Sequence, residues 1–136
     1  MSLSVTLAAF VVAMAFGGAF AEPQILCPEL SEQAERLLSE IATWEECGVD
    51  DLERAQRALA ERWEYLWVWI EADYLHERAD EASELANAAI ALRVTLVERC
   101  GQAHTSRELA NAIIALATRG RRLTDWARKL DEVVRR

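Results

Sequence analysis

The chain has 136 residues, enough for one domain and hardly more. Its formal net charge of −8 argues against a nucleic-acid-binding protein, because such proteins usually carry a basic surface. Ala, Leu, Glu and Arg dominate after residue 21, and both prolines lie near the start of that part, so the composition favours helices and leaves no convincing strand.

Residues 3–21 form an uncharged apolar run that ends in small side chains, with Ala19 and Ala21 placed as in a secretory cleavage site. No Lys or Arg precedes the run, although signal peptides normally have one there. As a helix it would be about 28 Å long, barely enough to cross a bilayer. We expect residues 1–21 to be a cleaved signal peptide or, alternatively, an uncleaved membrane anchor, and residues 22–136 to be a single helical domain.

The first helix is expected at about 28–47. Pro28 suits its first turn, and Gly48 suits the left-handed position that follows a helix. Between them, apolar side chains repeat at intervals of three and four, as on the buried face of a helix: Leu30, Ala34, Leu37, Ile41 and Trp44.

A second helix is expected to begin at residue 51, because Leu52, Leu59 and Leu66 recur every seven residues. It enters the segment Trp63–Tyr74, which holds three of the five tryptophans and both tyrosines. At 100° per residue, this segment is apolar on two faces. We expect one face to join the core: Trp63, Leu66, Trp67, Ile70 and Tyr74.

The opposite face of this segment carries Tyr65, Val68, Trp69 and Ala72. Tryptophan and tyrosine are enriched at binding hot spots. We therefore take Tyr65, Val68 and Trp69 as the candidate surface for a partner.

The apolar seven-residue spacing fails at Asp73 and Asp80, and residues 76–84 are mostly polar. This favours a break near 76–80. No Gly or Pro lies between residues 51 and 100, so one continuous helix of about 75 Å is the alternative. The prediction is an all-α, antiparallel helical bundle of four helices (about 28–47, 51–76, 80–100 and 106–135), or of three with 51–100 unbroken.

The last helix has the most regular pattern, with Leu109, Leu116, Leu123 and Leu130 spaced by seven, which is typical of a bundle core. Gly120 is expected inside this helix. Residues 22–98 carry 19 acidic and six basic side chains, whereas residues 99–136 carry four acidic and nine basic ones. The last helix thus offers a candidate basic surface, for the acidic helices of its own bundle or for anionic lipid: Arg119, Arg121, Arg122, Arg128 and Lys129.

Cys47 and Cys100 each precede a glycine expected to end a helix. In the four-helix arrangement both helix ends lie at the same end of the bundle, so we expect a Cys47–Cys100 disulfide. In a continuous 51–100 helix the two residues are about 75 Å apart and cannot bond. Cys27 would be left over, idle or in an intermolecular bridge.

No catalytic, cofactor or metal-binding residues are expected. After residue 21 the chain has only His76 and His104, no methionine, no haem-attachment sequence and no glycine-framed serine. The pairing of Asp73 with His76 resembles half of a di-iron motif, but such a site needs two copies and further carboxylates. The carboxylates mostly fall on polar helix faces.

These observations favour a non-catalytic helical-bundle protein of the cell envelope, periplasmic or secreted, that binds a protein partner or itself through an aromatic helix face. One alternative is an accessory subunit of an inner-membrane complex anchored by residues 3–21. Another is a carrier of a small apolar ligand, which would need a cavity beside Trp63 and Trp67. A membrane surface is a further partner to consider; nucleic acid is not.

Overall fold

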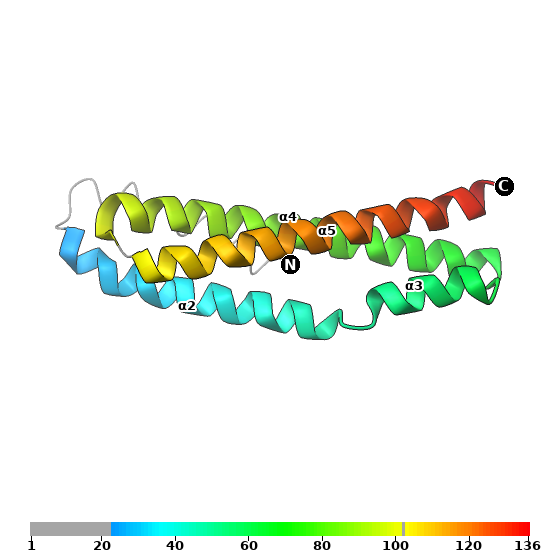
Figure 1. Ribbon diagram of the computed structural model, residues 1–136, viewed down its shortest axis with the longest axis horizontal. Helices are drawn as coiled ribbons and strands as arrows, with labels where there is room; N and C mark the ends of the chain where they lie inside the picture. The colour runs from blue at the N-terminus through cyan, green and yellow to red at the C-terminus, as the bar shows by residue number, and fades with distance from the viewer. Residues whose placement is uncertain (1–22, 102) are drawn as a thin grey trace.

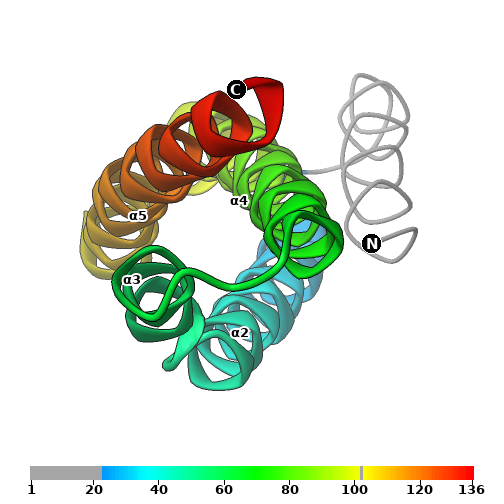
Figure 2. The ribbon, with the colours of Figure 1, turned by 90° about the vertical axis from the view of Figure 1, so that its right-hand side faces the viewer.

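The computed structural model describes residues 23–101 and 103–136, so the predicted signal peptide or membrane anchor, residues 1–21, lies outside the described residues. Four helices account for nearly all of the described part: α2 (Pro23–Cys47), α3 (Asp51–Ala60), α4 (Tyr65–Cys100) and α5 (Ala103–Arg135). α4 and α5 form a long antiparallel hairpin, and α2 and α3 follow one another along one side of it (Figure 1). Seen from its end, the bundle has α4 and α5 above α2 and α3 (Figure 2).

The predicted all-α antiparallel bundle is confirmed, but the helix boundaries differ from the expected ones. The bundle has three legs, as in the three-helix alternative, with α2 and α3 together forming one leg. The unbroken 51–100 helix of that alternative is wrong, because α3 ends at Ala60 and α4 begins at Tyr65. The reversal of the chain between the second and third helices falls at residues 61–64, whereas residues 76–80 lie inside α4. α2 and α5 begin earlier than expected, and Pro28 lies within α2 instead of in its first turn.

The core is a single cluster of leucines and alanines that runs along the bundle. All five expected apolar positions of α2, from Leu30 to Trp44, are buried. The four leucines of α5 are also buried, so the seven-residue spacing identified the core face of that helix. α4 contributes small and medium side chains that let the helices approach closely: Val68, Ala72, Leu75, Ala82, Leu85, Ala88, Ala89, Leu92 and Leu96.

Gly120 lies inside α5, as expected, and a Cβ there would lie 3.4 Å from the Ala82 Cβ of α4. The α4–α5 hairpin is therefore closely packed at this point.

The α3–α4 reversal is a helix ending of the Schellman type. The Trp63 amide donates to the Ala58 carbonyl (3.1 Å), and the Arg62 amide donates to that of Leu59 (3.3 Å). Arg62 occupies the left-handed position, with φ of 53°, where glycine is usual. For an L-residue with a side chain this conformation costs about 1–2 kcal/mol.

The polar run at 76–84 remains helical because its polar groups find partners on other helices. His76 Nε2 lies 2.7 Å from Asp131 Oδ2 of α5, and Arg78 is buried against α2 and α3. The interruption of the apolar repeat in this run therefore indicates polar contacts between helices of the bundle and not a loop.

The predicted Cys47–Cys100 disulfide is wrong, since Cys100 is bonded to Cys27, with a Cα–Cα distance of 5.7 Å. α2 and α4 are antiparallel, so the start of α2 lies beside the end of α4, and Cys47 lies at the opposite end of α2 (Figure 1). Cys47 is an exposed free thiol. None of the helices in residues 23–101 and 103–136 is both long and apolar enough to cross a membrane.

Candidate functional site

The first two turns of α4 carry a group of apolar side chains that the bundle does not cover. We call this group the aromatic end; its members are 42–61% exposed: Tyr65, Leu66, Trp67, Trp69 and Ile70. Together they surround most of the helix, since only Val68 of this hexapeptide is buried, at 1% exposure. The aromatic end lies at the α3–α4 reversal, the same end of the molecule as the last turn of α5 (Figures 1 and 2).

The structure corrects the predicted faces of this segment. Tyr65 and Trp69 are exposed, as expected of a partner surface, but Val68 is in the core with Ala72. Three residues expected in the core are exposed instead: Leu66, Trp67 and Ile70. Trp63 and Tyr74 are half-buried and pack against the core. The repeat of Leu52, Leu59 and Leu66 does not assign these faces, because the chain reverses at residues 61–64 and a new helix with its own phase begins there.

A pocket of about 700 Å³ opens beside the aromatic end, between the end of α3, the start of α4 and the end of α5. We call it the end pocket, and its lining is mostly apolar with charged groups among it: Ala58, Leu59, Arg62, Trp63, Glu64, Tyr65, Val68, Val133 and Arg136. Only Tyr65 belongs both to the pocket lining and to the aromatic end. The pocket lies beside Trp63, where the carrier hypothesis placed a cavity, although Trp67 does not line it.

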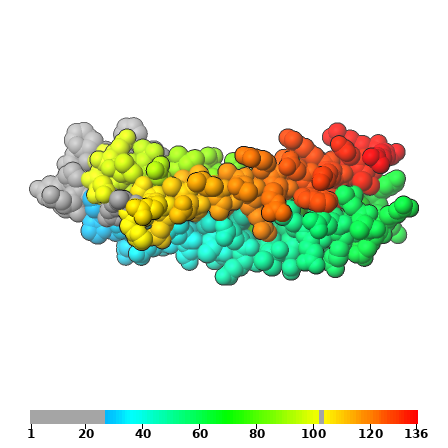
Figure 3. Space-filling model, in the orientation of Figure 1, coloured from blue at the N-terminus to red at the C-terminus, as the bar shows by residue number. Residues whose placement is uncertain are grey.

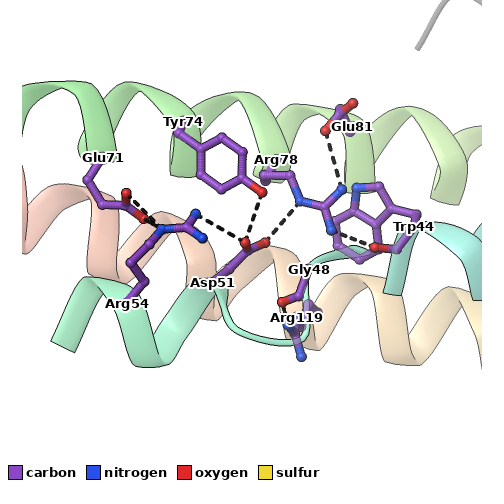
Figure 4. Close-up of polar contacts among 9 residues, drawn as sticks. All are labelled: Trp44, Gly48, Asp51, Arg54, Glu71, Tyr74, Arg78, Glu81 and Arg119. Carbon is purple, nitrogen blue, oxygen red and sulfur yellow. Dashed lines mark hydrogen bonds and ion pairs between the residues drawn. The ribbon is translucent and has the colours of Figure 1, made fainter. Parts of the chain in front are cut away.

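A buried polar network fixes the junction between α2 and α3 (Figure 4). At its centre is the Asp51 carboxylate, whose side chain is only 2% exposed. It accepts hydrogen bonds from Arg78 Nε (3.0 Å), Tyr74 Oη (2.9 Å) and Arg54 Nη2 (3.4 Å). Arg54 Nε also donates to both oxygens of Glu71, at 2.8 and 3.0 Å. Two arginines thus face two carboxylates, and the charges balance.

Arg78 links this network to the end of α2. Its Nη2 donates to the Trp44 carbonyl (2.6 Å), its guanidinium carbon lies 4.2 Å from the centre of the Trp44 ring, and Nη1 lies 3.6 Å from Glu81. Gly48 is needed here for space, because a Cβ on it would overlap Arg78 Nη2 and lie 2.6 Å from Asp51 Oδ2. Left-handed backbone is not the reason: among the described residues, positive φ occurs only at Arg62 and Gly101.

The network also raises the pKa of Tyr74. Burial of the phenol is the main cause, and the hydrogen bond to the Asp51 carboxylate adds to it. The polar groups of this cluster are committed to one another, which suits a joint that holds three helices together better than a site that binds a substrate.

Four of the five residues of the candidate basic surface are exposed, and the fifth, Arg119, is partly buried. Arg119 points inward and donates to the Gly48 carbonyl, so it belongs to the junction between α2 and α3. The other four side chains are exposed on α5, which runs along most of the length of the face shown in Figure 3, above α2 and α3: Arg121, Arg122, Arg128 and Lys129. Acidic Asp125 is exposed among them, and Lys129 lies over the Trp126 ring at 4.2 Å.

Within residues 23–101 and 103–136 no group of three or more His, Cys, Asp or Glu side chains is arranged to hold a metal ion. His76 contacts Asp131, and His104 contacts Glu108 one turn along α5, at 2.8 Å. Comparison of the chain with protein-family models, with curated proteins and with solved structures gave no match.

Sequence reasoning missed the Asp51–Arg78 network and the end pocket. The only sequence signal for the network was Arg78 inside a polar run, on the helix face that later carries Leu85 and Leu92. The end pocket depends on the reversal at residues 61–64, for which the sequence holds neither Gly nor Pro.

Proposed function

We propose that this is a non-catalytic, helical-bundle protein of the cell envelope that binds a protein partner through its aromatic end. The observation that carries the proposal is the exposure of three aromatic rings, a leucine and an isoleucine on two consecutive turns of α4. Tryptophan and tyrosine at such density are typical of the centre of an interface.

The size of the patch fits an interface. An aromatic side chain covers about 150–250 Å², so three rings at a little over half exposure offer roughly 300 Å². With Leu66 and Ile70 the exposed apolar area is on the order of 500 Å², summed over the sides of the helix, which is comparable to the largest patches of monomeric proteins. A standard interface buries about 800 Å² on each partner, so the patch would be its apolar centre.

The charges around the patch favour a protein over an anionic membrane surface. Exposed Glu61, Glu64 and Asp73 outnumber the one exposed basic residue that flanks it on the chain, Arg62, and no basic side chain lies within Tyr65–Ile70. Anionic lipid attracts helices that have basic residues beside the apolar face. A protein partner with an apolar surface and few acidic groups suits this arrangement better.

The test places a photo-cross-linking amino acid at position 66 and, as a control, at the exposed position 83 of the same helix. We expect a discrete adduct in cells from position 66 only, lost when Trp69→Asp is added. An adduct of twice the protein's mass would identify a second copy as the partner. Equal labelling from both positions, or none from position 66, would refute the proposal.

A stability measurement separates an interface role from a core role. Trp69→Ala should change the free energy of unfolding by less than about 1 kcal/mol, because the ring is half exposed. Leu75→Ala, in the core of the same helix, should cost about 2–5 kcal/mol. A large loss for Trp69→Ala would show that the ring supports the fold.

The cell-envelope location rests on the pattern of residues 1–21 and on the Cys27–Cys100 disulfide, since disulfides persist in oxidising compartments. The intact mass of the protein purified from its native source tests it. A mass that lacks residues 1–21 supports export and removes the anchored accessory subunit as an alternative; full length in the membrane fraction favours that alternative.

A further inference from the structure

The end pocket combines apolar walls with cationic groups. Leu59 and Trp63 form walls on the α3 side, Val68 contributes from α4, and Val133 contributes from α5. Arg62 and Arg136 line the same pocket. A concave apolar surface next to a guanidinium is the arrangement that holds a ligand with an apolar chain and an anionic head.

Within the described residues, no other side chain forms an ion pair or hydrogen bond with the Arg62 or Arg136 guanidinium. This separates them from Arg54 and Arg78, which are bonded to carboxylates of the bundle. Glu64 also lines the pocket and reduces its positive charge. The lining then has two cationic side chains, Arg62 and Arg136, and one anionic side chain, Glu64. The start of α4 opens beside it without a side-chain cap, so its first amide groups add to the attraction for an anion.

The backbone at Arg62 supports a role for its side chain. Glycine would take the left-handed position without strain, yet the chain has an arginine there, at φ of 53°. A strained non-glycine residue is a reason to ask what its side chain does. Arg62 lines the end pocket.

We propose that the end pocket binds a single-chain amphiphile with an anionic head, such as a fatty acid, from solution. The apolar chain lies against Leu59, Trp63 and Val133, and the head lies at Arg62. This site adjoins the partner surface in the proposed function and shares Tyr65 with it, but Trp67 and Trp69 do not line the pocket. Each of the two proposals can therefore fail without the other.

The first experiment is calorimetric titration of the folded, disulfide-bonded protein with dodecanoate, kept below its micelle concentration, and with dodecanol, which has the same chain and no charge. We expect dodecanoate to bind about tenfold more tightly than dodecanol, because a charge-assisted hydrogen bond is worth about that factor. Equal affinities, or no binding of dodecanoate below about 1 mM, would overturn the proposal.

The decisive variant is Arg62→Gly, because it should weaken binding without lowering stability. Glycine relieves the backbone strain, so the melting temperature should stay the same or rise, while dodecanoate should bind about tenfold more weakly and dodecanol as before. The matched control is Arg121→Ala, which removes an exposed arginine of α5 away from the pocket lining and should leave both affinities unchanged. Undiminished dodecanoate binding in Arg62→Gly contradicts the assignment of the head group to Arg62.

Two further variants locate the chain and separate this site from the partner surface. Val133→Trp should fill the pocket and abolish binding of both ligands, with folding checked by circular dichroism. Trp69→Ala should leave dodecanoate binding intact. If instead the protein binds anionic phospholipid vesicles in an Arg62-dependent manner and does not bind free dodecanoate, the ligand is a membrane lipid and the proposal fails in its present form.

Discussion

Replacing Gly48 by alanine should destabilise the protein strongly, although the change adds a single methyl group. Gly48 lies in the turn between α2 and α3, and its carbonyl accepts hydrogen bonds from the Asp51 amide (3.1 Å) and from Arg119. The new Cβ would overlap Arg78 Nη2. Arg78 must then leave its position between the Asp51 carboxylate and the Trp44 carbonyl.

The magnitude follows from what Arg78 would lose. Breaking a buried ion pair by removing one partner costs about 3–5 kcal/mol, because the remaining charge stays buried and unpaired. Part of this is recovered if Arg78 keeps its contact with Glu81 or reaches water, so we expect a loss of about 3 kcal/mol. A domain of this size has about 5–15 kcal/mol of stability, so the variant should still fold.

The measurement is equilibrium unfolding in urea, followed by circular dichroism at 222 nm with the disulfide intact. Gly120→Ala is the matched control: its Cβ would lie 3.4 Å from that of Ala82, and alanine should stabilise α5 by up to about 1 kcal/mol. In an Arg78→Met background the cost of Gly48→Ala should fall by at least about 1 kcal/mol, because the two changes act on the same contact. A loss below about 1 kcal/mol for Gly48→Ala alone would show that Arg78 moves aside freely and would refute the reasoning.

The remaining predictions concern the cysteines and Tyr74. Without reductant, a thiol reagent should label one residue, Cys47. Cys100→Ser should lower the free energy of unfolding by up to about 4 kcal/mol, because the disulfide spans 73 residues. Cys47→Ser should change it by less than about 0.5 kcal/mol. Equal effects of the two serine variants would contradict this pairing. The single tyrosine left in Tyr65→Phe should titrate at 295 nm above pH 10.0, because burial and the Asp51 carboxylate favour the neutral phenol. Because the folded state favours the neutral Tyr74 phenol, the contribution of Tyr74 to stability is complete below pH 10.0 and is lost as the pH rises through the higher pKa of the folded state. A Tyr74 titration midpoint at or below pH 10.0 would contradict this prediction.

The apolar repeats predicted the fold class and the core faces of α2 and α5, because each of these helices keeps one face in the core along its length. They failed at the reversal between α3 and α4. Helix endings usually show themselves through glycine or proline, and this one is built around Arg62 in a left-handed conformation. The break predicted at 76–80 is wrong for the converse reason. Asp73 and Asp80 interrupt the apolar spacing and residues 76–84 are mostly polar, but polar groups of this run, Arg78 among them, bond to other helices and α4 continues.

The errors in the predicted disulfide and in the predicted partner surface have one cause, the misplaced boundary between two helices. With a helix break at 76–80, Cys47 and Cys100 come to one end of the bundle; with the reversal at 61–64, Cys100 meets Cys27. The faces of the aromatic segment likewise depend on where the helix begins. Tyr65 and Trp69 remain on the surface in the structure, while Val68 turns into the core. Side-chain periodicity can assign faces only within one helix, and it has no information across a turn.

Arg78 and Arg62 both occupy positions where arginine is unusual, but they differ in whether the fold provides partners for the guanidinium. This difference indicates a structural role for Arg78 and a functional role for Arg62. Arg78 is a charge in the core, and its donors are met by Asp51 and the Trp44 carbonyl, so its place is explained by the joint that it forms. Arg62 is in a strained backbone conformation and lines a pocket without an internal partner for its guanidinium in the described part of the chain. Departures from local rules that the fold does not compensate are expected at functional sites. On that criterion the end of the bundle beside the aromatic residues is where ligand and partner binding should be sought first.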